Sequence, residues 1–469
     1  MQQILLSAFA FAVVVFALFT AAHALLYKRD TRAVIAWVGF IAVVPLAGAA
    51  LYWMAGVNRV RHRAKLLRPQ IVVEQANAAP SKVSVPDSYA PLVQLADKVN
   101  PFPLCAGNSV EPLENGDEAF PPMLEAIRGA RRSIALATYI FDSDEVGGSF
   151  AEALIAARRR GVEVRVLIDA VGQHYSRRSM LGRLRGTGVR AAAFLPVLMP
   201  RNPAAMNLRN HRKMLIVDGV DAFTGGMNIR AGNVLTRPSR HPVRDLQFRI
   251  RGPVVSQLMA VFAHDWAFAT GENLAEEPWF FAQSASGAVV ARVIPDGPDE
   301  YFEIQKMILL GALAQARRAV AIATPYFLPD AALISALNTA ALRGIDVHIL
   351  LPQTNNLKFV QWASFALYWQ VLERGCRIWH TPGPFDHSKL MLVDDEWVLV
   401  GSTNWDPRSL RLNFELNLEC YDAALNARMR AWFERRRGEG LEVTKEEMDG
   451  RNLAQRLRDG AARLLAPYL

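Results

Sequence analysis

The stretch HRKMLIVDGVDAFTGGMN (residues 211–228) recurs as HSKLMLVDDEWVLVGSTN (residues 387–404). Each copy starts with a histidine, has a lysine two positions later and an aspartate seven positions later, and ends with an asparagine. An apolar run, a turn signal and a second apolar run predict two antiparallel strands joined by a tight turn. Residues two apart share one face of a strand, so the histidine and lysine of each copy point the same way. The return strand brings the asparagine back beside them.

A longer duplication surrounds these two stretches. SIALAT at 133–138 matches AVAIAT at 319–324, and Gly161 matches Gly344. Around these matches the pattern predicts helix, strand, helix and strand in each copy. In the first copy these elements fall at 116–129, 133–141, 149–160 and 162–169. In the second they fall at 297–315 and 319–327, followed by a helix that ends near 343 and a strand at 345–351. A repeat of about 180 residues is too long for a solenoid. The sequence therefore predicts an α/β protein built from two tandem repeats.

The duplicated residues favour phosphodiester chemistry. Pairing the repeats about a pseudo-twofold axis would place two imidazoles, two ammonium groups and two amides in one site. Lys213, Lys389, Asn228 and Asn404 would hold the non-bridging oxygens of the phosphate. One histidine, His211 or His387, would attack phosphorus to give a phosphohistidine, and the other would protonate the leaving alkoxide. This chemistry requires no metal and no cofactor.

The two aspartates of the repeated motif have a second interpretation. Asp218 and Asp394 belong to the predicted catalytic set with the histidines and lysines. Each also begins the predicted turn, and aspartate is a common turn residue for purely structural reasons. Tyr139 and Tyr326, at the ends of the first strand of each repeat, would either line the site or pack in the core.

The N-terminus predicts a membrane hairpin. Residues 4–27 and 33–57 are two uncharged apolar runs, each long enough to cross a bilayer. A signal peptide is the weaker alternative, because no Lys or Arg precedes the first run and a second run follows at once. Five basic residues follow the second run (Arg59, Arg61, Arg63, Lys65 and Arg68), against three in the connecting loop. We therefore expect two spans, with both termini and the remaining chain in the cytoplasm.

Composition limits the partners of the chain. Its 469 residues carry a formal net charge of +9, which favours an anionic partner such as a membrane surface, a nucleic acid or a phosphorylated substrate. The sequence lacks basic residues interleaved with an aromatic platform, so nucleic acid is not expected. Three cysteines without a C-x-x-C pair argue against a disulfide framework or a zinc ribbon.

The duplicated H-x-K-x4-D motif resembles the signature of the phospholipase D superfamily. The hairpin sequence RDTRAVIAWVGFIAVVPLAGAALYWMAG, ATPYFLPD at 323–330, RNHRKMLIVDG at 209–219 and GSTNWDPRSLRLNFE at 401–415 are similar to membrane-anchored bacterial cardiolipin synthases. This resemblance implies one α/β sandwich per repeat, docked sheet to sheet, and a location in the bacterial cytoplasmic (inner) membrane. It also implies transfer of a phosphatidyl group from one phosphatidylglycerol to another, with release of glycerol.

The resemblance implies roles for further residues. His211 would be the nucleophile. Asp245 and Glu415 match the carboxylates that lie behind each catalytic histidine, some 25–35 residues downstream in the family. Gly226 and Ser402 form an asymmetric pair that family members commonly share. Phosphatidylglycerol and anionic membrane lipid are the expected partners, and the oligomeric state stays open.

The sequence leaves two alternatives to the synthase. One is a membrane-anchored hydrolase of the same superfamily, which would release phosphatidic acid, and the other is a scaffold whose site has decayed. The intact doublet argues against the scaffold. The expected organisation is an anchor at 1–60, a juxtamembrane linker at 61–110, a first repeat at 111–290 and a second repeat at 291–469.

Overall fold

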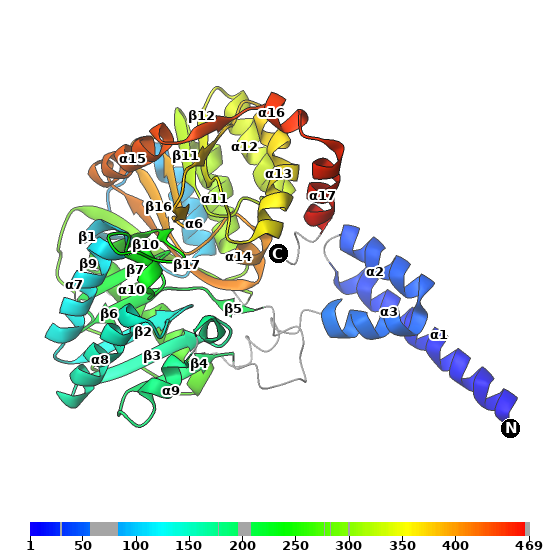
Figure 1. Ribbon diagram of the computed structural model, residues 1–469, viewed down its shortest axis with the longest axis horizontal. Coiled ribbons are helices and arrows are strands. Elements are labelled where there is room, and N and C mark those ends of the chain that lie inside the picture. The colour runs from blue at the N-terminus through cyan, green and yellow to red at the C-terminus, as the bar shows by residue number, and fades with distance from the viewer. Residues whose placement is uncertain are drawn as a thin grey trace. The chain divides into compact units, whose positions relative to one another are not determined.

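The computed structural model describes residues 1–28, 31–56, 83–176, 178–195, 208–275, 277–281, 283–298 and 301–464. The described chain separates into two compact units (Figure 1). The anchor unit consists of the described residues 1–56. The C-terminal unit starts at Val83 and holds both repeats together. Residues 61–82 of the predicted linker lie outside the described residues.

The anchor unit contains one helix that is long and apolar enough to cross a membrane. This helix, α1 (Gln2–Tyr27), confirms the first predicted run. The second run is not one helix: α2 (Thr31–Val43) ends before Pro45, which starts α3 (Pro45–Leu51), and η1 (Tyr52–Gly56) follows. Proline has no N–H to donate and its ring clashes with the preceding turn, so the chain breaks there.

After this break the chain folds back along α2. A Cβ atom on Gly48 would lie 2.9 Å from the Cα atom of Ile41, and the rings of Tyr52 and Trp37 lie 5.4 Å apart. Polar side chains bond one another within the unit: His23 Nδ1 lies 2.8 Å from the Tyr52 hydroxyl, and Trp53 Nε1 donates to the Thr20 hydroxyl (2.9 Å). The expected continuous span over 33–57 is therefore replaced by an antiparallel pair of short helices packed on α1.

The first repeat alternates strands and helices as predicted. Its elements are β1 (Cys105–Glu114), α7 (Asn115–Gly129), β2 (Ser133–Thr138), α8 (Glu145–Arg159), β3 (Glu163–Asp169), η3 (Gly172–Tyr175), α9 (Met180–Leu184), β4 (Arg190–Phe194), β5 (Arg209–Asn210), β6 (Met214–Val217), β7 (Asp221–Gly225), η5 (Ala231–Asn233), β8 (Val243–Arg244), β9 (Leu246–Arg251) and α10 (Val254–Thr270). Asp144 caps α8 by accepting the Gly147 N–H, and Gly161 takes a positive φ of 94° after the helix ends.

The second repeat follows the same order. Its elements are β10 (Val289–Asp296), α11 (Ile304–Gln315), β11 (Ala319–Ala323), α12 (Ala331–Leu342), β12 (Asp346–Pro352), α13 (Lys358–Leu372), β13 (Arg377–Thr381), β14 (Phe385–Asp386), β15 (Leu390–Val393), β16 (Trp397–Gly401), α14 (Pro407–Arg411), β17 (Asn413–Tyr421), α15 (Ala423–Gly438), β18 (Leu441–Val443), α16 (Lys445–Asp449) and α17 (Leu453–Leu464). Asp330 caps α12, and Gly344 has a φ of 86° after it, as in the first repeat.

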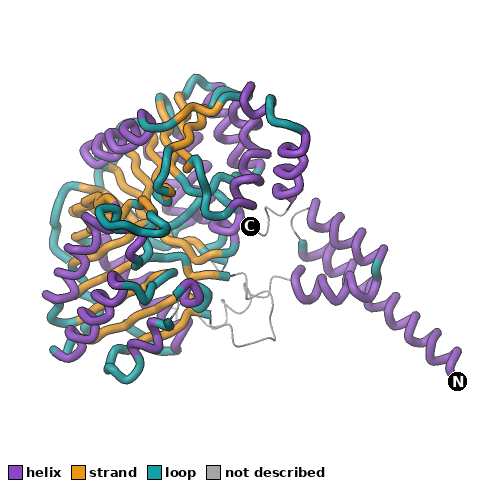
Figure 2. Tube along the Cα trace, in the orientation of Figure 1, coloured by secondary structure: helices purple, strands orange, loops and turns teal. Residues whose placement is uncertain are grey.

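The strand order shows the internal symmetry. It runs β9-β7-β6-β2-β3-β4 in the first repeat and β17-β16-β15-β11-β12-β13 in the second. The antiparallel pair of β1 and β10 joins these two halves into one continuous sheet. Strands occupy the interior of the C-terminal unit and helices lie on the outside and between the two halves (Figure 2). Two α/β repeats about a pseudo-twofold axis are thus confirmed.

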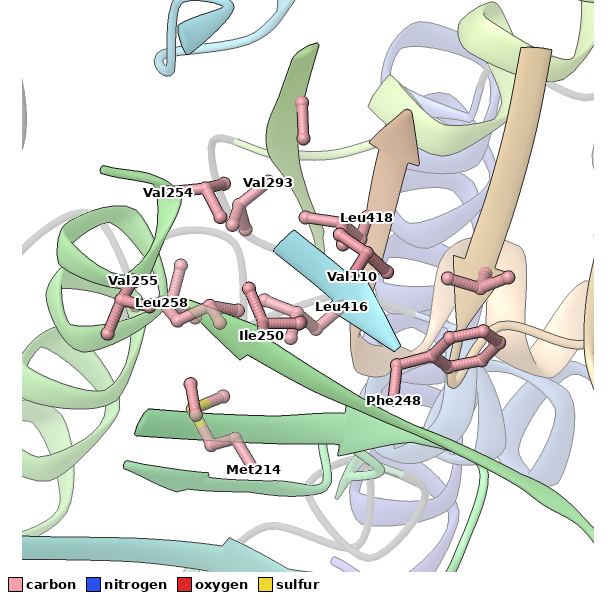
Figure 3. Packing of buried hydrophobic residues seen from close by; sticks show 14 of the residues in the cluster. Val110, Met214, Phe248, Ile250, Val254, Val255, Leu258, Val293, Leu416 and Leu418 are labelled. Atoms are coloured by element: carbon pink, nitrogen blue, oxygen red, sulfur yellow. The ribbon is translucent and has the colours of Figure 1, made fainter. Parts of the chain in front are cut away.

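A shared core binds the repeats together. Val110 of β1, Phe248 of β9, Leu258 of α10 and Leu416 of β17 belong to one buried cluster (Figure 3). Helices α10 and α15 pack against strands of both repeats, while α7, α8, α11 and α12 also contact strands, so the strands are largely apolar on both faces.

The first strand of each repeat begins before the expected domain boundary. The boundary expected at 110/111 falls inside β1, and that at 290/291 falls inside β10. Within the expected linker, η2 (Asp87–Tyr89) and α6 (Ala90–Val99) pack against α11.

Candidate active site

Two short strands carry the histidines across to the opposite repeat. β5 pairs in parallel with the start of β17, and the His211 N–H donates to Phe414 O (2.9 Å). β14 pairs in parallel with β8, and the His387 N–H donates to Arg244 O (2.8 Å). Continuing each register by one residue sets His211 beside Glu415 and His387 beside Asp245.

The carboxylates therefore serve the histidines in a crossed arrangement. His211 Nδ1 lies 3.0 Å from Glu415 Oε2, and His387 Nδ1 lies 2.7 Å from Asp245 Oδ2. The sequence expectation placed each carboxylate behind the histidine of its own repeat, and this pairing is wrong. A carboxylate accepts the Nδ1 proton and so leaves Nε2 of each ring for chemistry. The two rings are 6.3 Å apart between centroids, which makes a single site from both repeats.

Gly226 and Ser402 support the two carboxylates differently. A Cβ atom on Gly226 would lie 2.3 Å from Asp245 Oδ1, so only glycine leaves room for this carboxylate. Ser402 takes the equivalent position, and its hydroxyl donates to Glu415 Oε2 (2.5 Å). Asn413 Nδ2 donates to the other oxygen of Glu415 (3.0 Å). The asymmetry read from the sequence thus has a packing reason on one side and a hydrogen bond on the other.

Both lysines are buried beside the histidines. Lys213 Nζ donates to the His211 carbonyl (2.6 Å) and lies 5.6 Å from the Tyr139 ring centroid. Lys389 Nζ donates to the His387 carbonyl and lies 2.8 Å from His387 Nδ1. The positive charge of both ammonium groups acts on both histidines, as a site for an anionic phosphate requires.

Burial and charge shift the pKa values of these groups. Burial lowers the pKa of His211 against the pull of Glu415, and burial together with Lys389 lowers the pKa of His387 well below its usual range. Burial also lowers the pKa of Lys389 to about 8, although Asp245 and Glu415 oppose the shift.

The pKa values of the two carboxylates move in opposite directions. Burial raises the pKa of Asp245 to about 6, against Lys389. Burial alone would raise the pKa of Glu415 as well, but His211 and Lys213 outweigh it and leave this pKa lowered. The carboxylate behind His211 is therefore the more firmly ionised of the two.

The motif aspartates lie away from the histidines. Asp218 and Asp394 adopt positive φ angles of 52° and 50° at the turns that follow β6 and β15. The Asp218 carboxylate accepts the N–H groups of residues 131–133, and Asp394 accepts those of residues 317–319. Strand β6 separates Asp218 from Lys213, and these contacts favour the structural interpretation, in which each aspartate fixes its turn against the start of the neighbouring strand, over the catalytic one.

The two asparagines differ in their contacts. Asn228 Oδ1 accepts the Ile140 N–H (3.0 Å) at the end of the β2 segment. Asn404 is buried, and it contributes a hydrogen bond that lowers the pKa of Asp406. The asparagines therefore also fix the loops that follow β7 and β16.

The structure adds residues whose role the motif spacing does not show. Tyr139 lies edge-on to His211 (5.4 Å between ring centroids), and Tyr326 takes the same place beside His387 (6.3 Å), so both line the site. Arg212 is fully buried, and its Nε donates to the Glu415 carbonyl (2.9 Å) while its guanidinium pairs with Asp265. Arg212 occupies the variable position of H-x-K. Strand alternation alone would turn a residue at this position away from the face that His211 and Lys213 share.

Several known proteins are similar to this chain. Residues 123–266 and 309–437 match the family described as cardiolipin synthase, PLD-like domain. Cardiolipin synthase of Geobacillus sp. (strain WCH70) is 33% identical over 454 residues, which cover 95% of this chain and 90% of that protein. The major cardiolipin synthase of Bacillus subtilis (strain 168) is 32% identical over 456 residues, covering 94% and 95%.

A solved structure supports the fold. Phosphatidylserine synthase of Haemophilus influenzae Rd KW20 superposes with a TM-score of 0.60 at 16% identity, over 81% of this chain and 100% of that one. Fold, crossed histidine–carboxylate pairs and sequence similarity agree: the chain belongs to the family of cardiolipin synthases with a phospholipase D-like domain.

Proposed function

We propose that this protein makes cardiolipin by transferring a phosphatidyl group from one phosphatidylglycerol to the hydroxyl of another. The observation that carries the proposal is the pair of histidines, 6.3 Å apart, each with a carboxylate at Nδ1 and a lysine beside it. One imidazole that is unprotonated at Nε2 and a second that is protonated there can divide nucleophilic and acid–base work on one phosphodiester.

The first half-reaction breaks the bond between phosphorus and the glycerol headgroup. His211 Nε2 attacks phosphorus and forms an N–P bond, and His387 gives its Nε2 proton to the departing glycerol oxygen. Lys213 and Lys389 stabilise the charge on the non-bridging oxygens. We assign the attack to His211 because Glu415, with three hydrogen-bond donors around it, stabilises the positive charge that develops on the attacking ring.

The second half-reaction returns the site to its starting state. His387 takes the proton from the hydroxyl of a second phosphatidylglycerol, whose oxygen attacks phosphorus as the N–P bond breaks. A hydrolase of the same superfamily would form the same intermediate and use water instead. A synthase must hold the acceptor hydroxyl in line, and so gains the effective molarity of an oriented reactant.

The proposal is tested by supplying phosphatidylglycerol as the only lipid in mixed micelles. Purified full-length protein should yield cardiolipin and free glycerol, with phosphatidic acid as a minor product. Added glycerol should drive the reaction backwards, because one phosphodiester is exchanged for another. If phosphatidic acid dominates over a range of lipid densities, the protein is a hydrolase and the proposal fails.

For the topology we propose a single crossing of the bacterial inner membrane by α1, with the C-terminal unit in the cytoplasm. Because α3 returns along α2, the chain that leaves Gly56 emerges on the side where α1 ends. The basic loop around Lys28 and the basic residues from Arg59 to Arg68 then share one side, which the positive-inside rule assigns to the cytoplasm. A cysteine added before Met1 should react with a membrane-impermeant maleimide in whole cells, whereas the two-span topology predicts protection.

A further inference from the structure

Helix α17, the last helix of the described residues, presents an apolar face outward, which is unusual at an aqueous surface. In α17, Asp459 and Ala462 are buried, and Arg451 (2.6 Å) and Arg458 (2.9 Å) neutralise Asp459. The opposite face presents three leucines that are 64–76% exposed: Leu453, Leu457 and Leu464. A helix packed on a water-soluble protein normally buries its apolar stripe, so this row of leucines points to a further contact.

The exposed residues of α17 form an ordered stripe. At about 100° per residue, the three leucines fall within roughly 40° of one another on the helix surface. Arg456 and Arg463, both exposed, follow along one side of this row. Leucines flanked by arginines are typical of helices that lie in the interface of an anionic bilayer.

The start of α13 carries further exposed apolar side chains. Arg451 lies over the ring of Phe365 (4.6 Å) and Arg458 over that of Trp362 (4.5 Å), so the two helices are antiparallel (Figure 1). The C-terminal end of α17 therefore reaches the N-terminal end of α13. There Leu357 and Phe359 are 47% and 56% exposed, and Lys358 between them is exposed too.

These residues form what we name the α13/α17 surface: Leu357, Phe359, Leu453, Leu457 and Leu464, with Lys358, Arg456 and Arg463 beside them. It begins next to the wall of the active site. Asn356 accepts a hydrogen bond from the Tyr326 hydroxyl (2.9 Å), and the Tyr326 ring lies 6.3 Å from that of His387. Asn356 thus connects Tyr326, in the wall of the site, to Leu357, the first exposed apolar residue of this surface.

We propose that the α13/α17 surface docks on an anionic phospholipid bilayer and so places the mouth of the site at the headgroup level. The role of this contact in substrate entry rests on the function proposed above, whereas the contact itself does not. Three cationic side chains match a negatively charged lipid surface. The apolar α1 helix on the same chain keeps a bilayer within reach at high effective concentration, which favours lipid over a second copy of the protein.

Fluorescence quenching tests the contact without using activity. Leu457→Cys in the full chain, labelled with an environment-sensitive dye, is reconstituted into vesicles of phosphatidylglycerol and phosphatidylcholine. The matched control is Leu342→Cys at the end of α12, 67% exposed and at the opposite end of β12 from Leu357. Labelling of the native cysteines is measured in the parent chain and subtracted.

We expect nitroxide-bearing lipid to quench the dye at Leu457 at least about threefold more than the dye at Leu342, and aqueous iodide to show the reverse order. Equal quenching by iodide at both positions would overturn the proposal. The proposal would also be overturned if neither quencher reached the dye at position 457 and if this protection increased with protein density in the vesicle. A second copy of the protein would then cover the leucines.

A charge-insertion variant tests what the contact does for turnover. Leu453→Glu/Leu457→Glu/Leu464→Glu should lower the rate on vesicle phosphatidylglycerol at least about tenfold, because glutamates repel an anionic surface. The rate on monomeric short-chain phosphatidylglycerol should stay within about twofold, which also shows that the variant is folded. Leu342→Glu should change neither rate.

The two proposals fail in different ways. If the charge-insertion variant loses the same factor in rate on vesicle and on monomeric phosphatidylglycerol, or loses none on vesicles, then docking does not contribute to turnover. If the parent chain makes no cardiolipin from either substrate, the proposed function fails while the quenching result stands.

Discussion

His211 and His387 occupy matching positions in the two repeats, yet different side chains surround them. Glu415 behind His211 accepts hydrogen bonds from Ser402 and Asn413 as well, whereas Asp245 behind His387 fits against Gly226 and accepts the N–H of Leu246. The pKa of Glu415 is lowered and that of Asp245 is raised to about 6. Duplication thus supplies two equivalent histidines, and their unequal neighbours are the basis on which we propose separate tasks for them.

Removing the imidazoles should give the largest effect. His211→Ala and His387→Ala should each lower turnover by about 1000-fold or more, because neither task can pass to another group. Quenched turnover with labelled lipid should leave an acid-labile, base-stable adduct on His211 in the parent protein and none in His211→Ala. An adduct on His387 would reverse the two roles. Turnover should survive EDTA, and loss that a divalent metal restores would contradict the metal-free mechanism.

The two carboxylates should separate the two half-reactions. Glu415→Gln and Asp245→Asn keep the shape but remove the charge, and each should lower the rate about 10-fold to 1000-fold. Asp245→Asn impairs the acid, so a donor with p-nitrophenol as leaving group, which needs little protonation, should recover most of its activity. Glu415→Gln should gain no such recovery. If the same donor rescues both variants equally, the division of tasks between the two halves is wrong.

The alkaline limb of the pH profile should depend on Lys389. Its pKa of about 8 means that the ammonium charge is lost as the pH rises through 8, so kcat/KM should fall about tenfold between pH 7 and 9. Lys389→Arg stays charged and should move this limb to higher pH even where the overall rate is lower. Below pH 6, protonation of Asp245 should lower the rate of both proteins alike. An unchanged alkaline limb in Lys389→Arg would assign that limb to another group.

The smallest effect on turnover is expected at the motif aspartates. Asp218→Asn and Asp394→Asn retain a side chain that tolerates positive φ, so the turns persist while the charged acceptor of three N–H groups is lost. Each should lower the free energy of unfolding by about 1–3 kcal/mol in urea denaturation. Turnover of the folded protein should stay within about twofold, and a loss as large as that of the carboxylate variants would return these residues to the catalytic set.

Local sequence patterns were enough to predict the duplicated α/β fold and to single out both histidines and both lysines. Periodicity is local, so β6 and β7 could be predicted as a hairpin from Met214 to Gly225, and the matching spacing in the second repeat predicted that one site uses both copies. The apolar α1 was predicted for the same reason, since length and composition suffice.

Which groups meet in the site depends on long-range strand pairing. The crossed pairs of His211 with Glu415 and of His387 with Asp245 arise from strands β5 and β14 that pair with the opposite repeat, and no local pattern records such a long-range register. The return of α3 along α2 and the outward leucines of α17 likewise could not be predicted from local patterns. A local pattern states which face of a helix is apolar, but the partner that this face meets depends on packing between segments far apart in the chain.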